Sequence, residues 1–386
     1  MRILYDHQIF TIQKYGGISR YFYELLKCYS RQDDISCSIA LMFSENDYLL
    51  NGDLDFHINK GISTEEFCNG MHYLGKDSIY RALTLLGMSK HPLLMNRKYS
   101  MQKIKEGDFD IFHPTYYDAY FYNQLTSKPF VLTIYDMIHE KFSGIYFKPD
   151  HPVIINKKYL ATKASKIIAI SENTKNDIIK IYNIDEKNIH VVHLANSLKY
   201  DSINSNELRE KYILFIGERQ AYKNFKFFVK SIAPLLFEQR DLKLLCCGSV
   251  NFNTEEKQLI SELKLEGRVL HKVINNDTSL AFLYHNALAF IFPSLYEGFG
   301  IPILEAFSCG CPVVISNTGS FTEIGGDAAQ YFDPRSESSI LQVISEVLND
   351  DCKRSNMKQR GFKQLEKFSW EKTAQLTKEI YKEVLS

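Results

Sequence analysis

Two glutamates separated by seven residues frame the segment with the clearest chemical pattern. It reads Glu297-Gly-Phe-Gly-Ile-Pro-Ile-Leu-Glu305 and follows a short apolar run, residues 289–294, that predicts a strand. Pro302 suits the first turn of a helix, where a missing N–H costs no hydrogen bond. The free N–H groups and the dipole of such a helix start favour a phosphate. Since a carboxylate can accept hydrogen bonds from adjacent hydroxyls, one glutamate beside the phosphate and one beyond it would suit a nucleotide sugar.

The same segment has a purely structural interpretation. A Gly-Pro turn can simply lead into a helix whose first turn favours acidic residues. That interpretation accounts for Glu305, but it leaves the combination of Glu297, two loop glycines and Pro302 unexplained. We therefore favour a binding site at this strand-to-helix turn.

Two cations follow a second predicted strand, Tyr212–Gly217. Arg219 can make planar bidentate contacts and Lys223 offers a compact charge, and both suit a diphosphate. The alternative is a pair of solvated surface cations. Cations at a helix start oppose the helix dipole, which makes this alternative less favourable.

Weaker motifs follow strands in the first half of the chain. Gly16 and Gly17 allow the backbone to approach a ligand closely, or they simply make a tight turn. Asp136, directly after Tyr135, can bind an acceptor hydroxyl or cap its own loop, and the sequence does not decide between these roles. Ser171 is best explained as the N-cap of a helix.

Short apolar runs alternate with helical stretches along the whole chain. This alternation occurs twice, which predicts an α/β protein with two Rossmann-like, doubly wound domains facing a cleft. We place the N-terminal domain at residues 1–198 and the C-terminal domain at 199–370, because the polar stretch between residues 195 and 211 has no strong periodicity. Residues 371–386 predict a C-terminal helix that can pack back on the N-terminal domain.

The Glu-x7-Glu spacing around Glu-Gly-Phe-Gly-Ile-Pro resembles the signature of family 4 glycosyltransferases, which have the GT-B fold. The resemblance implies retaining transfer of a hexose from a nucleotide-diphosphate sugar, of the UDP or GDP type, with no cofactor and no metal. It implies a saccharide or lipid-linked saccharide as acceptor, and a place in bacterial O-antigen, capsule or lipopolysaccharide assembly. The N-terminal domain would then bind the acceptor and the C-terminal domain the nucleotide sugar.

The resemblance also implies roles for individual residues. Glu305 would bind the ribose, and Glu297 would contact the transferred sugar beside the Phe299–Gly300 backbone. Arg219 and Lys223 would neutralise the leaving diphosphate, so that these two residues, Glu297 and Asp136 form the implied catalytic set. The implied donor-binding set comprises Gly16, Gly17, Arg219, Lys223, Val273, Ile274, Glu297, Gly298, Phe299, Gly300, Ile301 and Glu305, with Val273 and Ile274 beside the nucleotide base.

One departure from the family pattern keeps a second function open. Many relatives carry a histidine where Tyr135 stands, and in the family that histidine contacts the donor sugar. The alternative is therefore a catalytically inactive subunit that binds nucleotide sugars. A dehydrogenase would need Gly-x-Gly-x-x-Gly after a strand, and the Gly298–Ile303 segment lacks the third glycine. A glycan phosphorylase would need a cofactor lysine that we cannot place.

The composition limits which binding partners and which cell compartment we expect. Basic and acidic residues number 46 each, so no whole-surface field for nucleic acid is indicated. The eight cysteines form no Cys-x-x-Cys pair, which favours reduced, cytoplasmic usage. A local basic stretch with interleaved leucines, residues 76–105, predicts either a helix packed on its own domain or a peripheral contact with the inner face of the cytoplasmic membrane.

Overall fold

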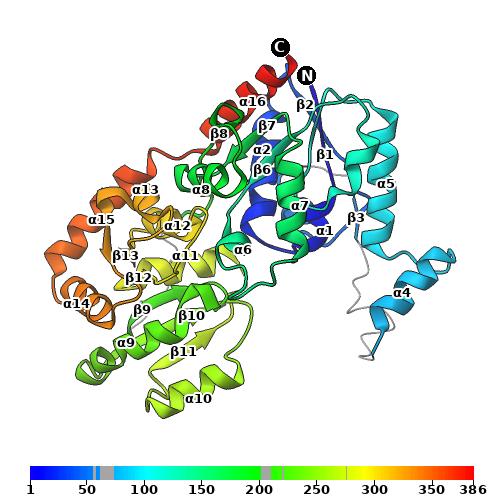
Figure 1. Cartoon of the computed structure of the whole chain (residues 1–386). Helices are drawn as coiled ribbons and strands as arrows, with labels where there is room; N and C mark the ends of the chain where they lie inside the picture. The colour runs from blue at the N-terminus through cyan, green and yellow to red at the C-terminus, as the bar shows by residue number, and fades with distance from the viewer. Residues whose placement is uncertain (55–57, 61–73, 201–209, 220, 275) are drawn as a thin grey trace.

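The computed structural model describes residues 1–54, 58–60, 74–200, 210–219, 221–274 and 276–386, which form two α/β halves (Figure 1). Part of the predicted boundary stretch, residues 201–209, lies outside the described residues. Both halves consist of parallel strands covered by helices, as the alternation in the sequence predicts. Within the described parts of the chain, no helix combines the length and apolar character that crossing a membrane requires.

The N-terminal half contains two parallel three-stranded sheets. The first has the order β2 (Ser36–Ile39), β1 (Arg2–Tyr5), β5 (Ile111–His113), and the second has the order β6 (Val131–Ile134), β7 (Lys166–Ala169), β8 (Ile189–Val191). A parallel bridge between Phe112 and Phe130 links them. A small pair, β3 (Phe43–Ser44) and β4 (Asn59–Lys60), lies apart. The helical segments are α1 (Gln8–Ile12), α2 (Gly17–Tyr29), α3 (Asp47–Asn51), α4 (Lys76–Leu85), α5 (Pro92–Glu106), η1 (Ala119–Gln124), α6 (Ile138–Lys141), α7 (Pro152–Ala161), α8 (Glu172–Tyr182) and η2 (Glu186–Asn188).

The C-terminal half contains a six-stranded parallel sheet. Its order is β11 (Val269–Lys272), β10 (Leu242–Cys247), β9 (Lys211–Ile216), β12 (Ala289–Phe292), β13 (Val313–Ser316), β14 (Ala329–Phe332). The order reverses between β9 and β12, which is the doubly wound arrangement whose switch point binds ligands. Every residue of β12 and β13 is buried, as expected for central parallel strands. The helical segments are η3 (Ala221–Lys223), α9 (Phe225–Glu238), α10 (Thr254–Glu262), α11 (Asp277–Asn286), α12 (Ile301–Ser308), α13 (Phe321–Gly325), η4 (Gly326–Ala328), α14 (Glu337–Leu348) and α15 (Asp351–Leu365).

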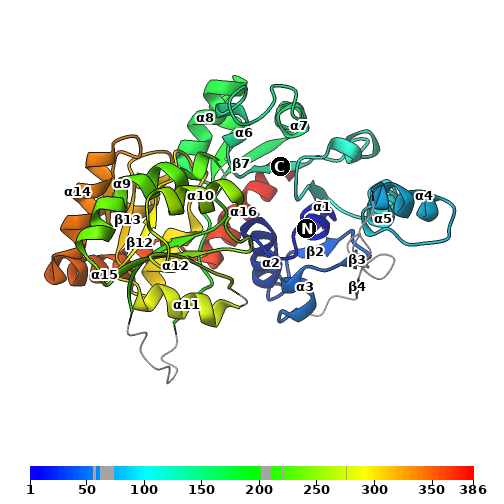
Figure 2. The ribbon, with the colours of Figure 1, turned by 90° about the horizontal axis from the view of Figure 1, so that it is seen from below.

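The last helix, α16 (Trp370–Leu385), returns to the N-terminal half and contacts α2 and β7. Figure 2 shows α2 and α16 along the junction of the two halves. The Tyr381 hydroxyl lies 3.0 Å from the Tyr5 hydroxyl and 2.6 Å from Nδ1 of His113. Burial lowers the pKa of His113 to about 3, so this imidazole is neutral. A buried polar network thus fastens the end of the chain to the first sheet.

The basic stretch 76–105 forms two helices with different surroundings. Helix α5 contacts α1, β3 and η1, whereas α4 projects from the N-terminal half (Figure 1). The end of α4 and the turn after it expose Leu85, Leu86 and Met88. The stretch therefore joins a packed helix to a projecting one.

Candidate active site

A cavity of about 350 Å³ is lined by loops from both halves. It brings together ten of the predicted site residues: Gly16, Gly17, Asp136, Lys223, Glu297, Gly298, Phe299, Gly300, Ile301 and Glu305. These residues follow β1, β6, β9 and β12 in the chain, where parallel sheets present their carboxyl ends. Three predicted residues, Arg219, Val273 and Ile274, are not among those that line it.

An ion pair between Lys223 and Glu297 occupies the C-terminal side of the cavity. Lys223 Nζ donates to Glu297 Oε1 at 2.5 Å, and the two side chains are 15% and 12% exposed. Nζ also lies 5.1 Å from the centroid of the Phe292 ring. An anionic ligand that attracted Lys223 would release the Glu297 carboxylate for neutral hydroxyls.

The loop after Glu297 depends on glycine at two positions. A Cβ on Gly298 would lie 1.7 Å from the Tyr135 carbonyl oxygen, so only glycine lets the two halves approach this closely. Gly300 has φ +104°, a conformation that side-chain-bearing residues rarely adopt. The Ser320 hydroxyl can donate to the carbonyl oxygens of Glu297 and Phe299, at 3.1 and 2.8 Å. The loop is held in one shape as it leads into α12.

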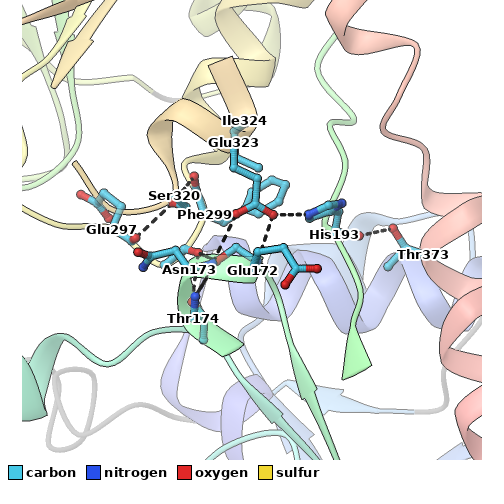
Figure 3. Close-up of polar contacts among 12 residues, drawn as sticks. Glu172, Asn173, Thr174, His193, Glu297, Phe299, Ser320, Glu323, Ile324 and Thr373 are labelled. Carbon is cyan, nitrogen blue, oxygen red and sulfur yellow. Dashed lines mark hydrogen bonds and ion pairs between the residues drawn. The ribbon is translucent and has the colours of Figure 1, made fainter. Parts of the chain in front are cut away.

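Polar contacts between the halves hold this loop against α8. The Ser171 hydroxyl donates to the Gly298 carbonyl at 2.6 Å, and Ser171 is also the N-cap of α8, as predicted. Figure 3 shows Glu323 between the start of α8 and His193. Its carboxylate accepts from the Glu172 backbone N–H at 2.9 Å and lies 2.5 Å from His193 Nε2. Contacts from the N-terminal half therefore fix the Glu297 loop.

Glu305 lies within α12, and the hydroxyl of Tyr284 donates to its Oε2 at 3.1 Å. Burial raises the pKa of Glu305, while the charge of Arg20 and the Tyr284 hydrogen bond oppose the rise. Arg20, from the N-terminal half, also lines the cavity. The carboxylate predicted to bind ribose thus lies near a cation from the other half of the molecule.

Arg20 is a cavity residue that our sequence reasoning missed. Its Nη2 donates to the Tyr15 hydroxyl and to Asp277 Oδ2, both at 2.8 Å, and its Nε donates to the Tyr48 hydroxyl at 3.0 Å. Burial alone would lower the pKa of Arg20, but Tyr48, Tyr15, Asp277 and Glu305 together raise it. The contact with Asp277 joins α2 to α11. Its only local signal was its place three residues after Gly17, which does not reveal the contact with Asp277.

Asp136 lines the cavity and also caps its own loop. Its Oδ1 accepts from the Ile138 backbone N–H at 2.9 Å, and its carbonyl accepts from Lys157 Nζ at 2.9 Å. Lys157 is fully buried and pairs with Glu140 at 3.0 Å. Tyr135 is buried in the cavity wall, and its hydroxyl reaches the Thr115 carbonyl at 3.3 Å. The two roles considered for Asp136 are therefore compatible.

Arg219 lies in a buried ion pair away from this cavity. Its Nε donates to Glu256 Oε1 at 2.9 Å, and both side chains are at most 5% exposed. Its Nη2 donates to the carbonyls of Val250 and Asn251. Val273 is exposed and Ile274 is half-buried. A diphosphate contact of Arg219 and a base contact of Val273 and Ile274 stay predictions.

Comparisons with known proteins agree with this architecture. Residues 15–195 match the family described as Glycosyltransferase Family 4, and residues 198–364 match Glycosyl transferases group 1. O-antigen chain mannosyltransferase B of Escherichia coli is 33% identical over 231 residues, which are 57% of this chain and 61% of that protein. O-antigen chain mannosyltransferase RfbU of Salmonella typhimurium is 30% identical over 203 residues, covering 52% and 56%. The matches thus span about three fifths of these relatives' own length.

Solved structures show the same fold over the whole chain. A sucrose-phosphate synthase from Thermosynechococcus elongatus aligns with a TM-score of 0.74 at 16% identity, covering 100% of this chain and 99% of that one. HepE of Anabaena, in complex with UDP and glucose, aligns with a TM-score of 0.73 at 17% identity, covering 98% and 99%. The chain therefore belongs to the glycosyltransferases that join a Family 4 domain to a group 1 domain in a GT-B fold.

Proposed function

We propose that this protein is a retaining glycosyltransferase that moves a hexose, with mannose as the first candidate, from a nucleotide-diphosphate sugar to a saccharide or lipid-linked saccharide. The observation that carries the proposal is the shared cavity of Lys223, Glu297, Glu305 and the start of α12. The mannosyltransferase names of the relatives support the sugar and a role in bacterial surface polysaccharide assembly. The relatives named above are called transferases, which favours an enzyme over the inactive binding subunit.

Different groups on the C-terminal side of the cavity would bind the diphosphate, the ribose and the sugar of the donor. The diphosphate would bind at the start of α12 and attract Lys223 from Glu297. Glu305 would accept hydrogen bonds from the ribose hydroxyls, and the released Glu297 would accept them from the sugar. Each charged group of the cavity would then have a partner in the complex.

The proposed reaction breaks the bond between the anomeric carbon and the diphosphate oxygen. The acceptor oxygen forms its bond on the same face of the sugar, and a donor phosphate oxygen takes the acceptor's proton. Lys223 and the helix start would stabilise the negative charge of the leaving diphosphate. In this mechanism no metal ion takes part. Glu297 positions the sugar and forms no covalent bond. Closure of the two halves would exclude water from the reactive centre.

The decisive experiment is a donor panel with three measurements. GDP-mannose, UDP-glucose and UDP-N-acetylglucosamine are tested for thermal stabilisation, hydrolysis and transfer, with and without EDTA. We expect one donor to stabilise the protein and react in EDTA, giving a product with the anomeric configuration of the donor by NMR. An inverted product contradicts retention. Stabilisation without hydrolysis or transfer favours the inactive binding subunit.

We also propose that α4 contacts an anionic membrane on the cytoplasmic face. Leu85, Leu86 and Met88 are exposed at its end, beside Arg81 and Lys90. Apolar residues in the headgroup region and cations near anionic lipid together favour peripheral binding. Co-sedimentation with phosphatidylglycerol vesicles should be strong for the wild type and weak for a Leu85→Ser, Leu86→Ser variant. Equal binding of the two proteins contradicts the contact.

A further inference from the structure

A second cavity, of about 310 Å³, adjoins the first on the N-terminal side. It lies between the end of α1, β3 and the segments around the starts of α4 and α5. Gln13 lines both cavities. Its Oε1 accepts from the Ser19 backbone N–H at 3.1 Å and would lie 2.6 Å from a Cβ on Gly16, so the side chain packs against the glycine loop. Gln13 is therefore part of the wall of both cavities.

Two side chains of the second cavity carry polar atoms without a partner. Two atoms, Oε1 of Glu45 and Nδ1 of His91, are buried, and neither makes a hydrogen bond within the described residues. An unsatisfied buried polar atom costs about 1–3 kcal/mol. The last torsion of a Glu side chain has a broad energy minimum, so rotation about it can turn a carboxylate oxygen toward a ligand in the cavity. Both residues line the cavity, so the polar groups of a ligand there could approach them.

The other side chains favour a neutral ligand over an anion. Asp77 already pairs with Arg81 at 2.5 Å and with His91 Nε2 at 2.9 Å, which leaves little unbalanced positive charge. Ile12, 60% exposed, and Leu93 add apolar surface to the wall. Hydrogen-bonding groups beside apolar surface match a sugar ring, which has hydroxyls at its edge and C–H groups on its faces.

We propose that the second cavity binds a neutral sugar unit of the acceptor, at least one residue away from the hydroxyl that reacts, through Glu45 and His91. The inference rests on the proposed transferase function, because it assigns this unit to the same acceptor chain. Gln13 would lie beside the linkage between the reacting sugar and the bound unit. The acceptor would then be an oligosaccharide, and its affinity would grow with length.

The test compares methyl α-mannoside, α-mannobiose and α-mannotriose as acceptors with the full chain. For the wild type we expect KM to fall about 10-fold from the monosaccharide to the trisaccharide, as for one or two added hydrogen bonds to a charged group. Glu45→Gln should lose most of this gain and keep its monosaccharide turnover and its thermal stabilisation by the donor. Ile12→Trp, at an exposed position, should narrow the cavity and act in the same direction. Asp47→Asn, an exposed carboxylate two residues from Glu45, is the matched control.

Saturation-transfer NMR with mannotriose measures the same site without turnover. Signal from the wild type that weakens in Glu45→Gln and not in Asp47→Asn supports the site. Absence of binding to the wild type overturns it, and so does equal binding by the two variants. Mannotriose binding in a protein that hydrolyses and transfers no donor sugar would keep the sugar site and reject the transferase function, so the two failures are distinguishable.

Discussion

Two cations that follow β9, four residues apart, have very different surroundings. Lys223 lies in the cavity between the halves and pairs with Glu297, which itself lines that cavity. Arg219 is not among the residues that line it, and its guanidinium donates to Glu256 of α10 and to two backbone carbonyls of the segment before α10. The difference shows that a cation after a strand can serve ligand binding or packing. The direction of the side chain decides which.

The largest effect on activity is expected for Lys223, the cation that lines the cavity. Lys223→Met removes the positive charge proposed to stabilise the leaving diphosphate and leaves Glu297 unpaired. We expect kcat/KM to fall about 100- to 1,000-fold, the range for losing one group that stabilises developing charge. Steady-state transfer with the best donor measures it, and Lys226→Met, at an exposed cation on the next helix, is the control. A fall below 10-fold would contradict the assignment.

Loss of the Arg219 ion pair should mainly lower the free energy of unfolding. Arg219→Met leaves the Glu256 carboxylate buried without its partner, and breaking a buried pair this way costs about 3–5 kcal/mol. Denaturant unfolding measures the loss. Donor binding by the remaining folded protein should stay close to that of the wild type. If Arg219→Met instead abolished donor binding at unchanged stability, Arg219 would turn into the cavity on binding, and the contrast with Lys223 would disappear.

A smaller effect is expected at the contact between α2 and α11. Asp277→Asn weakens the ion pair with Arg20, whose partner oxygen is 2.8 Å away. Because Asp277 is partly exposed, we expect the free energy of donor binding to weaken by about 1 kcal/mol or less. The KM for the donor should then rise by up to about 5-fold. Kinetics at low and high salt measure it, since salt should reduce the difference between variant and wild type. A difference that salt leaves unchanged speaks against an electrostatic contact.

The smallest and most specific effect concerns pH. Burial raises the pKa of Glu305 and Arg20 opposes that rise, so the carboxylate should bind ribose only above a midpoint higher than that of a free glutamate. Donor affinity should fall as the pH drops through this midpoint. Arg20→Met should move the midpoint to higher pH, whereas Lys27→Met on the same helix should not. Donor affinities measured between pH 4 and 8 test this prediction. An unchanged midpoint in Arg20→Met would show that Arg20 does not influence the ionisation of Glu305.

Most of the site was predictable because its signals are local. Strand ends, the glycine loop and Pro302 lie within one stretch of chain, and the structure brings the Glu297–Glu305 segment to the cavity as expected. The helix predicted at residues 371–386, observed at Trp370–Leu385, and the N-cap at Ser171 are confirmed for the same reason. Arg20 was missed because its partner Asp277 is 257 positions away. No spacing rule connects residues that meet only after two domains pack together.

The sequence by itself determined the alternation of strands and helices, the doubly wound class and the loop that carries Glu297 and Glu305. These follow from periodicity, turn residues and helix starts, which act over a few residues. Only the tertiary structure decided that Lys223 enters the cavity while Arg219 binds Glu256, and that Arg20 reaches across to Asp277. The reason is physical: a buried charge must find an opposite charge or a hydrogen-bond partner. Which partner it finds depends on the packing of segments distant in the chain.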